Sequence, residues 1–299
     1  MSGEDVSGLI GQSATIDSSY NRKDLITYAI GIGCDELRYV YENDGDFEAF
    51  PTYPFVLAFK GTEDDVVGFP SAAMQESNVM PGLPGSKFVL DGERQIEIIR
   101  PISAEGEKLK IKSTLVGIHQ KGKGALVETT SEFIDEEGKV CVKLTNGTFV
   151  VGAKGFTPEK AGQTYSLAVP PPKRAPDAVC EMKTSPTQAH VYRLSGDYNP
   201  LHIDPMMAQM NGFKEPILHG LCSLGHAAHA VLKTYGGNEA ARFRGMKCRF
   251  ASPVLPGQTL VTEMWKEGNG RVIFLTKVKE TNKVVISNAY VDLAPEAKL

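Results

Sequence analysis

The chain has 299 residues, of which 41% are hydrophobic and 23% charged, with 32 basic and 36 acidic side chains. The net charge of -4 excludes electrostatic binding of nucleic acid, which needs clustered Lys and Arg, and the ordinary apolar fraction excludes wholesale disorder. The five cysteines include no C-x-x-C pair, which argues against a zinc finger or a disulfide scaffold and favours free thiols in a reducing compartment.

Neither a signal peptide nor a membrane span is expected. Glu4 and Asp5 stand where a signal peptide would be basic, and no apolar run approaches the roughly 18 residues of a membrane helix.

The first half of the chain predicts helices followed by a group of strands. A helix is expected over residues 23–34, and a second helix near residues 54–75 is interrupted by glycines, a proline and an acidic run. Segments rich in Val, Ile, Leu and Thr then predict strands at 93–100, 109–119, 125–135 and 140–151.

A proline-rich spacer is predicted over residues 152–182. It contains Pro158, the triplet Pro170-Pro171-Pro172 and Pro176, and proline runs favour an extended, semi-rigid chain. The spacer divides the sequence into two units, 1–151 and 183–296.

The second half repeats the pattern of the first. A long amphipathic helix is expected over residues 219–235, ended by Gly236-Gly237, with strands at 246–251, 259–267, 271–280 and 284–293. Ile99-Arg100-Pro101-Ile102 aligns with Ala251-Ser252-Pro253-Val254, and Gly138-Lys139-Val140 aligns with Asn282-Lys283-Val284. The match predicts an internal duplication in an α+β protein, with an antiparallel meander in each unit.

The densest polar cluster of the sequence lies between residues 192 and 205. Asp197 and His202 are separated by an Asn199-Pro200 step, which turns the chain and can aim both side chains at one point. A carboxyl and an imidazole so placed suit general acid–base work on water. The alternative is structural: Asp197 caps a helix and His202 packs in a turn.

Gly220 opens the predicted long helix, so its N–H has no partner within that helix and lies at the positive end of the helix dipole. Such a donor can hold the oxygen of an ester or thioester carbonyl as negative charge develops on it. The alternative is that glycine only allows close packing of the helix on a sheet.

These residues carry a resemblance to a known family. Residues 192–205, followed by Pro216-Ile217-Leu218-His219-Gly220-Leu221-Cys222, resemble the hydratase 2 motif of MaoC-like (R)-specific enoyl-CoA hydratases, and most closely the hydratase unit of peroxisomal multifunctional enzymes of type 2. The likeness continues through residues 249–260 and 286–295, and is weaker around residues 89–93 and 121–122.

The resemblance implies a double hot-dog fold, in which two antiparallel-sheet units wrap central helices. It implies that Asp197 and His202 are catalytic, that Asn199 steadies their turn and that the N–H of Gly220 is the oxyanion donor. The family has a histidine where this chain has Asp91, a departure that bears on substrate binding. Contacts to the acyl-CoA are expected from Asp91, Gly92, Lys121, Tyr198, Pro200, Leu201 and Phe250.

The activity so implied is reversible hydration of trans-2-enoyl-CoA to (3R)-3-hydroxyacyl-CoA in peroxisomal β-oxidation. CoA enters as part of the substrate, and neither a cofactor nor a metal is expected. His226 and His229 have no carboxylate or thiolate at matching helical spacing, so they are interpreted as helix-face residues. Alternatives are a hot-dog acyl-CoA thioesterase, which would attack the carbonyl carbon, and a non-catalytic acyl-CoA binding module.

Three further expectations complete the prediction from the sequence. The chain is expected to form a homodimer. Its interrupted first helix should leave an apolar cavity for medium and long acyl chains, walled by Phe55, Val56, Leu57 and Phe59. Ala297-Lys298-Leu299 is a variant of the Ser-Lys-Leu address, which predicts binding to the peroxisomal import receptor and a peroxisomal location.

Overall fold

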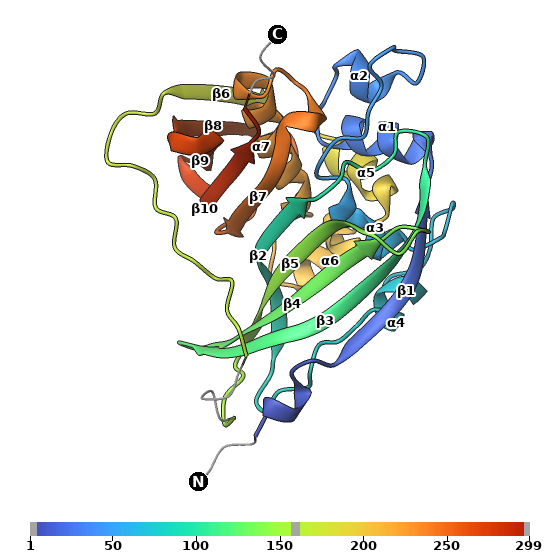
Figure 1. Ribbon diagram of the computed structural model, residues 1–299. Coiled ribbons are helices and arrows are strands. Elements are labelled where there is room, and N and C mark those ends of the chain that lie inside the picture. The colour runs from blue at the N-terminus through green and yellow to red at the C-terminus, as the bar shows by residue number, and fades with distance from the viewer. Residues whose placement is uncertain (1–4, 157–161, 296–299) are drawn as a thin grey trace.

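The computed structural model describes residues 5–156 and 162–295. Within them, one antiparallel sheet of ten strands runs in the order β1-β3-β4-β5-β2-β7-β10-β9-β8-β6 (Figure 1). The strands are β1 (Ser13–Tyr20), β2 (Phe88–Ile98), β3 (Glu107–Lys121), β4 (Gly124–Ile134), β5 (Val140–Val151), β6 (Ala178–Lys183), β7 (Phe243–Phe250), β8 (Thr259–Lys266), β9 (Arg271–Val278) and β10 (Lys283–Leu293).

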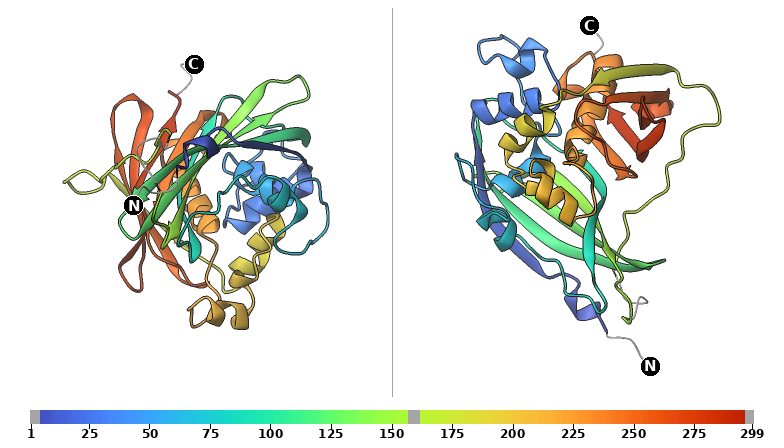
Figure 2. Two further views of the ribbon diagram at one scale, coloured as in Figure 1. Left: turned by 90° about the horizontal axis from the view of Figure 1, so that it is seen from below. Right: turned by 180° about the vertical axis from the view of Figure 1, so that it is seen from behind.

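The helices gather on one side of this strongly curved sheet (Figure 2). The α-helices are α1 (Arg22–Gly31), α2 (Leu37–Val40), α3 (Pro54–Lys60), α4 (Ala72–Glu76), α5 (Gln188–Tyr192), α6 (Pro205–Met210) and α7 (Gly220–Tyr235). Short 3₁₀ turns are η1 (Ser7–Leu9), η3 (Arg193–Ser195), η4 (Pro200–His202), η5 (Ala240–Arg242) and η6 (Gly268–Gly270).

The strand order shows the predicted duplication. It reads 1-3-4-5-2 from one edge to the middle and 6-8-9-10-7 from the other, so each unit contributes five strands in the same arrangement. The two units join where β2 pairs with β7, with Ile96 opposite Met246. The aligned turns also agree, because Gly138 and Asn282 both adopt positive φ, at 80° and 54°.

The helix α7 is the centre of the second unit. Every residue from Leu221 to Leu232 is buried, so the helix is enclosed on all sides rather than on one stripe. It packs against β6, β7, β8 and β10. Its counterpart α3 in the first unit has only seven residues, as the interrupted pattern predicted.

The residues expected to wall a cavity beside α3 are packed into the core instead, which corrects that part of the expectation from the sequence. Phe55, Val56 and Leu57 are at most 2% exposed and belong to the main core, and Phe59 packs against it. The same core contains aromatic side chains with contacting rings, namely Tyr20, Tyr28, Tyr39, Phe50 and Tyr53. Large rings supply the buried area that the short helix lacks.

Several boundaries differ from the sequence-based expectation. The edge strand β1 was not predicted, and β6 begins at Ala178, inside the segment expected to be a spacer. Both strands are held by distant partners, β3 and β8. The first helix ends at Gly31 rather than residue 34, because Gly33 adopts a φ of 71°, which is outside the range of a right-handed helix. Glycine is needed at this position, since a Cβ there would lie 2.7 Å from His226 Nε2.

The described part of the spacer is attached to the outside of the sheet. The Lys247 ammonium, on a side chain only 3% exposed, donates to the carbonyl oxygens of Tyr165 and Leu167 at 2.9 Å each. The Tyr165 N–H donates to Glu128, and the Val169 N–H donates to Asn288. The extended segment is therefore a strap bound across the sheet, visible in Figure 1 as the trace that connects the two units.

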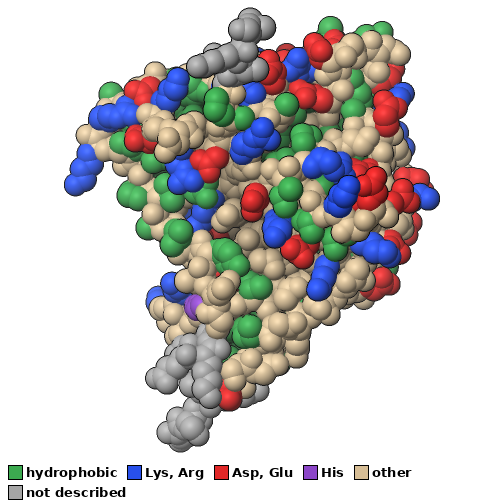
Figure 3. Space-filling view, in the orientation of Figure 1, with side chains coloured by type: hydrophobic (Ala, Val, Ile, Leu, Met, Phe, Trp, Pro, Cys, Tyr) green, Lys and Arg blue, Asp and Glu red, His purple; other side chains and the backbone are tan. Residues whose placement is uncertain are grey.

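Acidic and basic side chains are intermixed on the face shown in Figure 3, as the near balance of charges predicts. A bilayer-spanning helix is not found within residues 5–156 and 162–295, since none there combines the required length and apolarity.

Candidate active site

The loop that carries Asp197 and His202 is shaped by its neighbours. Gly196 has a φ of 127°, and a Cβ at this position would come within 2.9 Å of the Lys60 side chain and 3.2 Å of its backbone nitrogen. Glycine is therefore required where this loop crosses α3. The Asn199 side chain accepts a hydrogen bond from the Leu201 N–H at 3.1 Å and so begins the 3₁₀ turn that presents His202.

The structure brings Asp197 and His202 together. Asp197 is 8% exposed, and its carboxylate accepts a hydrogen bond from the Asn199 N–H at 3.3 Å. The His202 Nδ1 lies 2.8 Å from the Ile217 carbonyl oxygen. Since a carbonyl oxygen can only accept, Nδ1 carries the proton, and Nε2 of the neutral ring is a free proton acceptor.

Burial acts on the two groups in opposite directions. It raises the pKa of the Asp197 carboxyl above its ordinary value, against the opposing charge of His202. It lowers the pKa of the His202 imidazole, against the opposing charge of Asp197. Desolvation is the larger effect for each group, so the site shifts the carboxyl toward its protonated form and the imidazole toward its neutral form.

His219 is a third member of the site, to which the sequence analysis assigned no role. Its ring stacks on the His202 ring with centroids 3.8 Å apart, and its Nε2 lies 3.2 Å from the Asp197 carbonyl oxygen. It is 1% exposed, and burial lowers its pKa well below the ordinary value. The sequence could have indicated this role through the position of His219, directly before Gly220 in the motif.

Nitrogen and oxygen atoms of Asp197, His202 and His219 all lie within 4.8 Å of one another, a grouping that also suits a metal. The arrangement of the imidazole rings favours acid–base chemistry instead, because they are stacked at 28° rather than convergent on one point.

Gly220 is the first residue of α7 and is exposed, with His219 as the N-cap. A Cβ at Gly220 would lie 3.3 Å from the Phe250 ring, so the sequence-predicted contacts Gly220 and Phe250 are adjacent. The Gly220 N–H has no acceptor one turn earlier in the helix, and the dipole of a 16-residue helix adds partial positive charge there.

The strand β2 of the first unit lies beside β7, the strand that carries Phe250. Glu93 pairs with Arg249 across the junction of the units, which places Asp91 and Gly92 near the end of β7 that carries Phe250. Gly92 lies in a register shift between β2 and β5, where a Cβ would come within 2.8 Å of the Gly147 carbonyl oxygen. This position therefore requires glycine.

Asp91 is held by Arg94, which the sequence analysis did not single out. The Arg94 Nε donates to both carboxylate oxygens, at 2.9 and 3.0 Å, and its Nη1 donates to Asn146. Both charges act on Asp197: Arg94 lowers the pKa of that carboxyl and Asp91 raises it. This chain therefore has an ion pair beside the site.

The remaining predicted contacts lie at different distances from this cluster. Tyr198, Pro200 and Leu201 are half-buried on the same loop, and the Arg193 guanidinium lies 5.1 Å from the centre of the Tyr198 ring. Lys121 is exposed at the end of β3, three strands away from β2, which corresponds to roughly 14 Å across a sheet. Cys222 is fully buried and donates to the Gly31 carbonyl oxygen, as expected of a packing residue.

Comparison with known proteins matches two family models. Residues 18–152 match the MFE-2 hydratase 2 N-terminal domain, and residues 168–289 match the MaoC like domain. A solved MaoC-like dehydratase from Phytophthora capsici superimposes with a TM-score of 0.88 at 44% identity, covering 96% of this chain and 97% of that one. A Mycobacterium tuberculosis protein with a double hot-dog fold superimposes with a TM-score of 0.57 over 95% of this chain at 12% identity, which bears on the fold alone.

Fold and site together thus define a MaoC-like double hot-dog protein, and the expected fold class is confirmed. Among curated relatives, peroxisomal multifunctional enzyme type 2 of Drosophila melanogaster is 44% identical over 94% of this chain, which spans only 47% of that relative. Peroxisomal enoyl-CoA hydratase 2 of Arabidopsis thaliana is 38% identical, covering 92% of this chain and 90% of the relative. The chain belongs to the MaoC-like hydratase 2 family.

Both of these relatives are named as peroxisomal proteins, which confirms the expected peroxisomal location. The tripeptide Ala297-Lys298-Leu299 lies outside the described residues.

Proposed function

We propose that this protein hydrates trans-2-enoyl-CoA reversibly to (3R)-3-hydroxyacyl-CoA, with water activated between Asp197 and His202. The relatives support the reaction class, because one is named enoyl-CoA hydratase 2. The observation that carries the assignment of roles is the buried Asp197–His202 pair, in which the His202 Nδ1 is fixed by the Ile217 carbonyl oxygen.

We assign the role of base to His202 and that of acid to Asp197, in keeping with the directions in which burial shifts their pKa values. The free Nε2 of neutral His202 accepts a proton from water as the water oxygen forms a bond to C3 of the substrate. The electrons of the C2=C3 double bond move toward the thioester, and its oxygen becomes an oxyanion. As the carbonyl re-forms, C2 takes the proton of the protonated Asp197 carboxyl. The proton on His202 then returns to Asp197, so the pair is regenerated.

The oxyanion is held by the N–H of Gly220 at the start of α7. The glycine is exposed and borders the Phe250 ring, which can pack against the substrate close to this donor. A preorganised N–H at a helix N-terminus stabilises the charge that develops only in the transition state. This arrangement needs neither a metal nor a redox cofactor, since CoA arrives with the substrate.

The substrate contacts are proposed to span both units. Tyr198, Pro200 and Leu201 border the acyl group, while Asp91, Gly92 and Phe250 border the thioester end. The exposed Lys121 suits a phosphate of the CoA moiety, because a lysine ammonium binds phosphate as a point charge.

The test follows the loss of enoyl-CoA absorbance with the full chain, together with the chirality of the product and the release of free thiol. A (3R) product without thiol release supports the proposal. An (S) product, or no loss of the enoyl signal, overturns the hydratase assignment. Stoichiometric thiol release would identify a thioesterase instead.

We also propose that the import receptor reads Ala297-Lys298-Leu299. A fluorescent fusion at the N-terminus should form peroxisomal puncta that become diffuse when Leu299 is deleted. Puncta that persist without Leu299 would show that this tripeptide is not the address. The homodimer remains a prediction, to be tested by light scattering of the full chain.

A further inference from the structure

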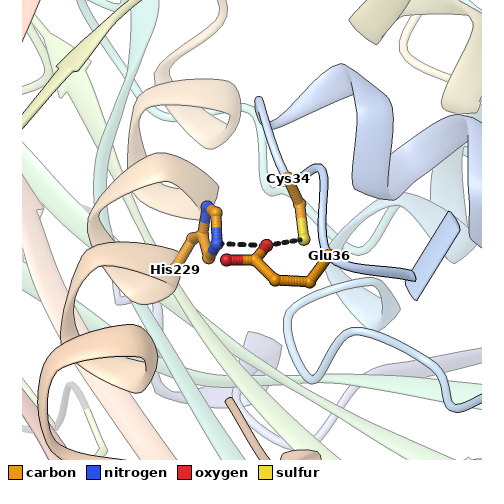
Figure 4. A group of neighbouring side chains, drawn as sticks. All are labelled: Cys34, Glu36 and His229. Carbon is orange, nitrogen blue, oxygen red and sulfur yellow. Dashed lines mark hydrogen bonds and ion pairs between the residues drawn. The ribbon is translucent and has the colours of Figure 1, made fainter. Parts of the chain in front are cut away.

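A second cluster of reactive side chains lies outside the proposed active site, where the two units meet. Cys34 and Glu36 belong to the loop between α1 and α2 of the first unit, and His229 lies on α7 of the second (Figure 4). The sequence analysis found no thiolate or carboxylate at helical spacing from His229. Tertiary contact supplies both, from residues almost two hundred positions earlier in the chain.

One carboxylate oxygen is shared between the thiol and the imidazole. The Oε2 of Glu36 lies 3.0 Å from the Cys34 Sγ and 2.8 Å from the His229 Nε2. The other oxygen, Oε1, is engaged by outer partners, the Lys233 ammonium at 3.0 Å and the Asn238 amide at 3.3 Å. The carboxylate is therefore oriented with Oε2 directed at the two remaining groups, as ligating carboxylates are oriented by outer hydrogen bonds.

The imidazole of His229 has an unusual environment. It is 1% exposed; its Nε2 lies 2.8 Å from the Glu36 Oε2, and its Nδ1 has no hydrogen-bond partner among the described residues. Its ring packs edge-on against Phe50 at 6.0 Å, which provides no hydrogen bond of ordinary strength. The imidazole therefore meets the rest of the cluster through Nε2, the nitrogen that a bound metal would take.

We propose that Cys34, Glu36 and His229 form a zinc site that joins the two units. The donor set of one thiolate, one carboxylate oxygen and one imidazole nitrogen matches the preference of Zn²⁺. The three donor atoms already lie within 4.8 Å of one another. Ligands of a tetrahedral Zn²⁺ are separated by about 3.3–3.7 Å, so only small side-chain shifts are needed, and water completes the coordination.

Binding requires one change of protonation at sulfur. The Cys34 S–H bond breaks, its proton leaves to solvent and a Zn–S bond forms, with no oxidation or reduction. The two ligand charges then balance the charge of the ion. Lys233 is 52% exposed, so its ammonium can move away from the ion while the Asn238 amide still holds Oε1.

This site is separate from the proposed catalytic pair. His229 is nine residues along α7 from Gly220, which corresponds to roughly 14 Å along a helix axis. The zinc would therefore act on stability, because it connects the loop after α1 to α7, and zinc binding can be measured without an activity assay.

The experiment measures zinc in the full chain after purification without chelator, alongside C34S, H229Q and E36Q. Cys141→Ser is the matched control, since Cys141 is also buried but donates to the Phe133 carbonyl oxygen in the first unit. Wild type and C141S should hold about one Zn²⁺ per chain, and the three cluster variants less than about a tenth of that.

A second measurement does not depend on folding of the variants. Wild-type protein stripped by chelator should gain melting temperature when Zn²⁺ is added, because only the folded chain presents the site. Added Co²⁺ should produce a thiolate-to-metal absorption band that C141S retains. The proposal is overturned if the stripped wild type shows neither effect, or if C34S and H229Q still bind Zn²⁺ as wild type does.

Discussion

The imidazole rings of His202 and His219 are stacked, with centroids 3.8 Å apart and an angle of 28° between their planes. The contact joins the loop after α5 to the residue that caps α7, and so fixes the proposed base relative to the Gly220 N–H. The His219 ring contacts His202 and the Asp197 carbonyl oxygen, and His219 directly precedes Gly220 in the chain, so this residue connects all three parts of the site.

Replacing His219 tests this positioning role. His219→Phe keeps an aromatic ring against His202 but removes the bond to Asp197, and we expect kcat to fall by about tenfold with the fold retained. His219→Ala removes the stacked ring as well and should destabilise the protein by about 2–4 kcal/mol. Steady-state kinetics and urea unfolding separate the two effects. Full activity in His219→Ala would exclude a positioning role.

Asp197 and His202 should each be essential for turnover. Asp197→Asn and His202→Gln are each expected to lower kcat by roughly 10²–10⁴, the usual contribution of a positioned acid or base. Asn is close in shape to the protonated carboxyl that burial favours, so Asp197→Asn should fold normally. Circular dichroism checks the fold, and a variant that folds but retains wild-type turnover would remove that residue from the mechanism.

The pH profile of kcat/KM should be bell-shaped. The acid limb reports protonation of His202, whose pKa burial lowers, and the alkaline limb reports ionisation of Asp197, whose pKa burial raises. Arg94→Gln removes the positive charge that lowers the Asp197 pKa and leaves Asp91 unpaired, and both effects raise that pKa. The alkaline limb of Arg94→Gln should therefore move to higher pH. A shift to lower pH would contradict these assignments.

Gly220 allows the oxyanion donor to be removed with a matched control. Gly220→Pro deletes the N–H at a first helical position where proline is tolerated, and should reduce kcat by roughly 10²–10³. Gly220→Ala keeps the N–H but places a Cβ 3.3 Å from the Phe250 ring. Any fall in kcat in this variant therefore reports crowding against Phe250 alone. Equal losses in the two variants would mean that crowding, not the donor, explains the effect.

The strap across the sheet should contribute to stability through Lys247. Lys247→Met removes the two hydrogen bonds to the carbonyl oxygens of Tyr165 and Leu167 and leaves Glu93 without this cation. We expect a loss of about 2–4 kcal/mol in the free energy of unfolding by urea. Lys112→Met, at an exposed position on β3, is the control and should change stability by less than about 0.5 kcal/mol.

Local pattern by itself determined much of this protein. The apolar runs predicted eight of the strands and the long helix, and the aligned Pro101 and Pro253 turns predicted the duplication. Asp197, Asn199 and His202 lie within six residues, so one turn was enough to bring the proposed acid and base together. Hydrophobic periodicity and turn chemistry act over a few neighbours, and these features depend on nothing more distant.

Other features were decided only by the tertiary structure. The edge strands β1 and β6 form because β3 and β8 offer hydrogen-bonding partners, not because their own sequences are strongly apolar. The residues expected to wall a cavity beside α3 pack in one core with aromatic residues from several segments, and close packing of distant side chains cannot be read from local spacing. The meeting of Cys34 and Glu36 with His229 likewise exists only once the two units share one sheet, whereas Arg94 and Asp91 lie three residues apart on β2.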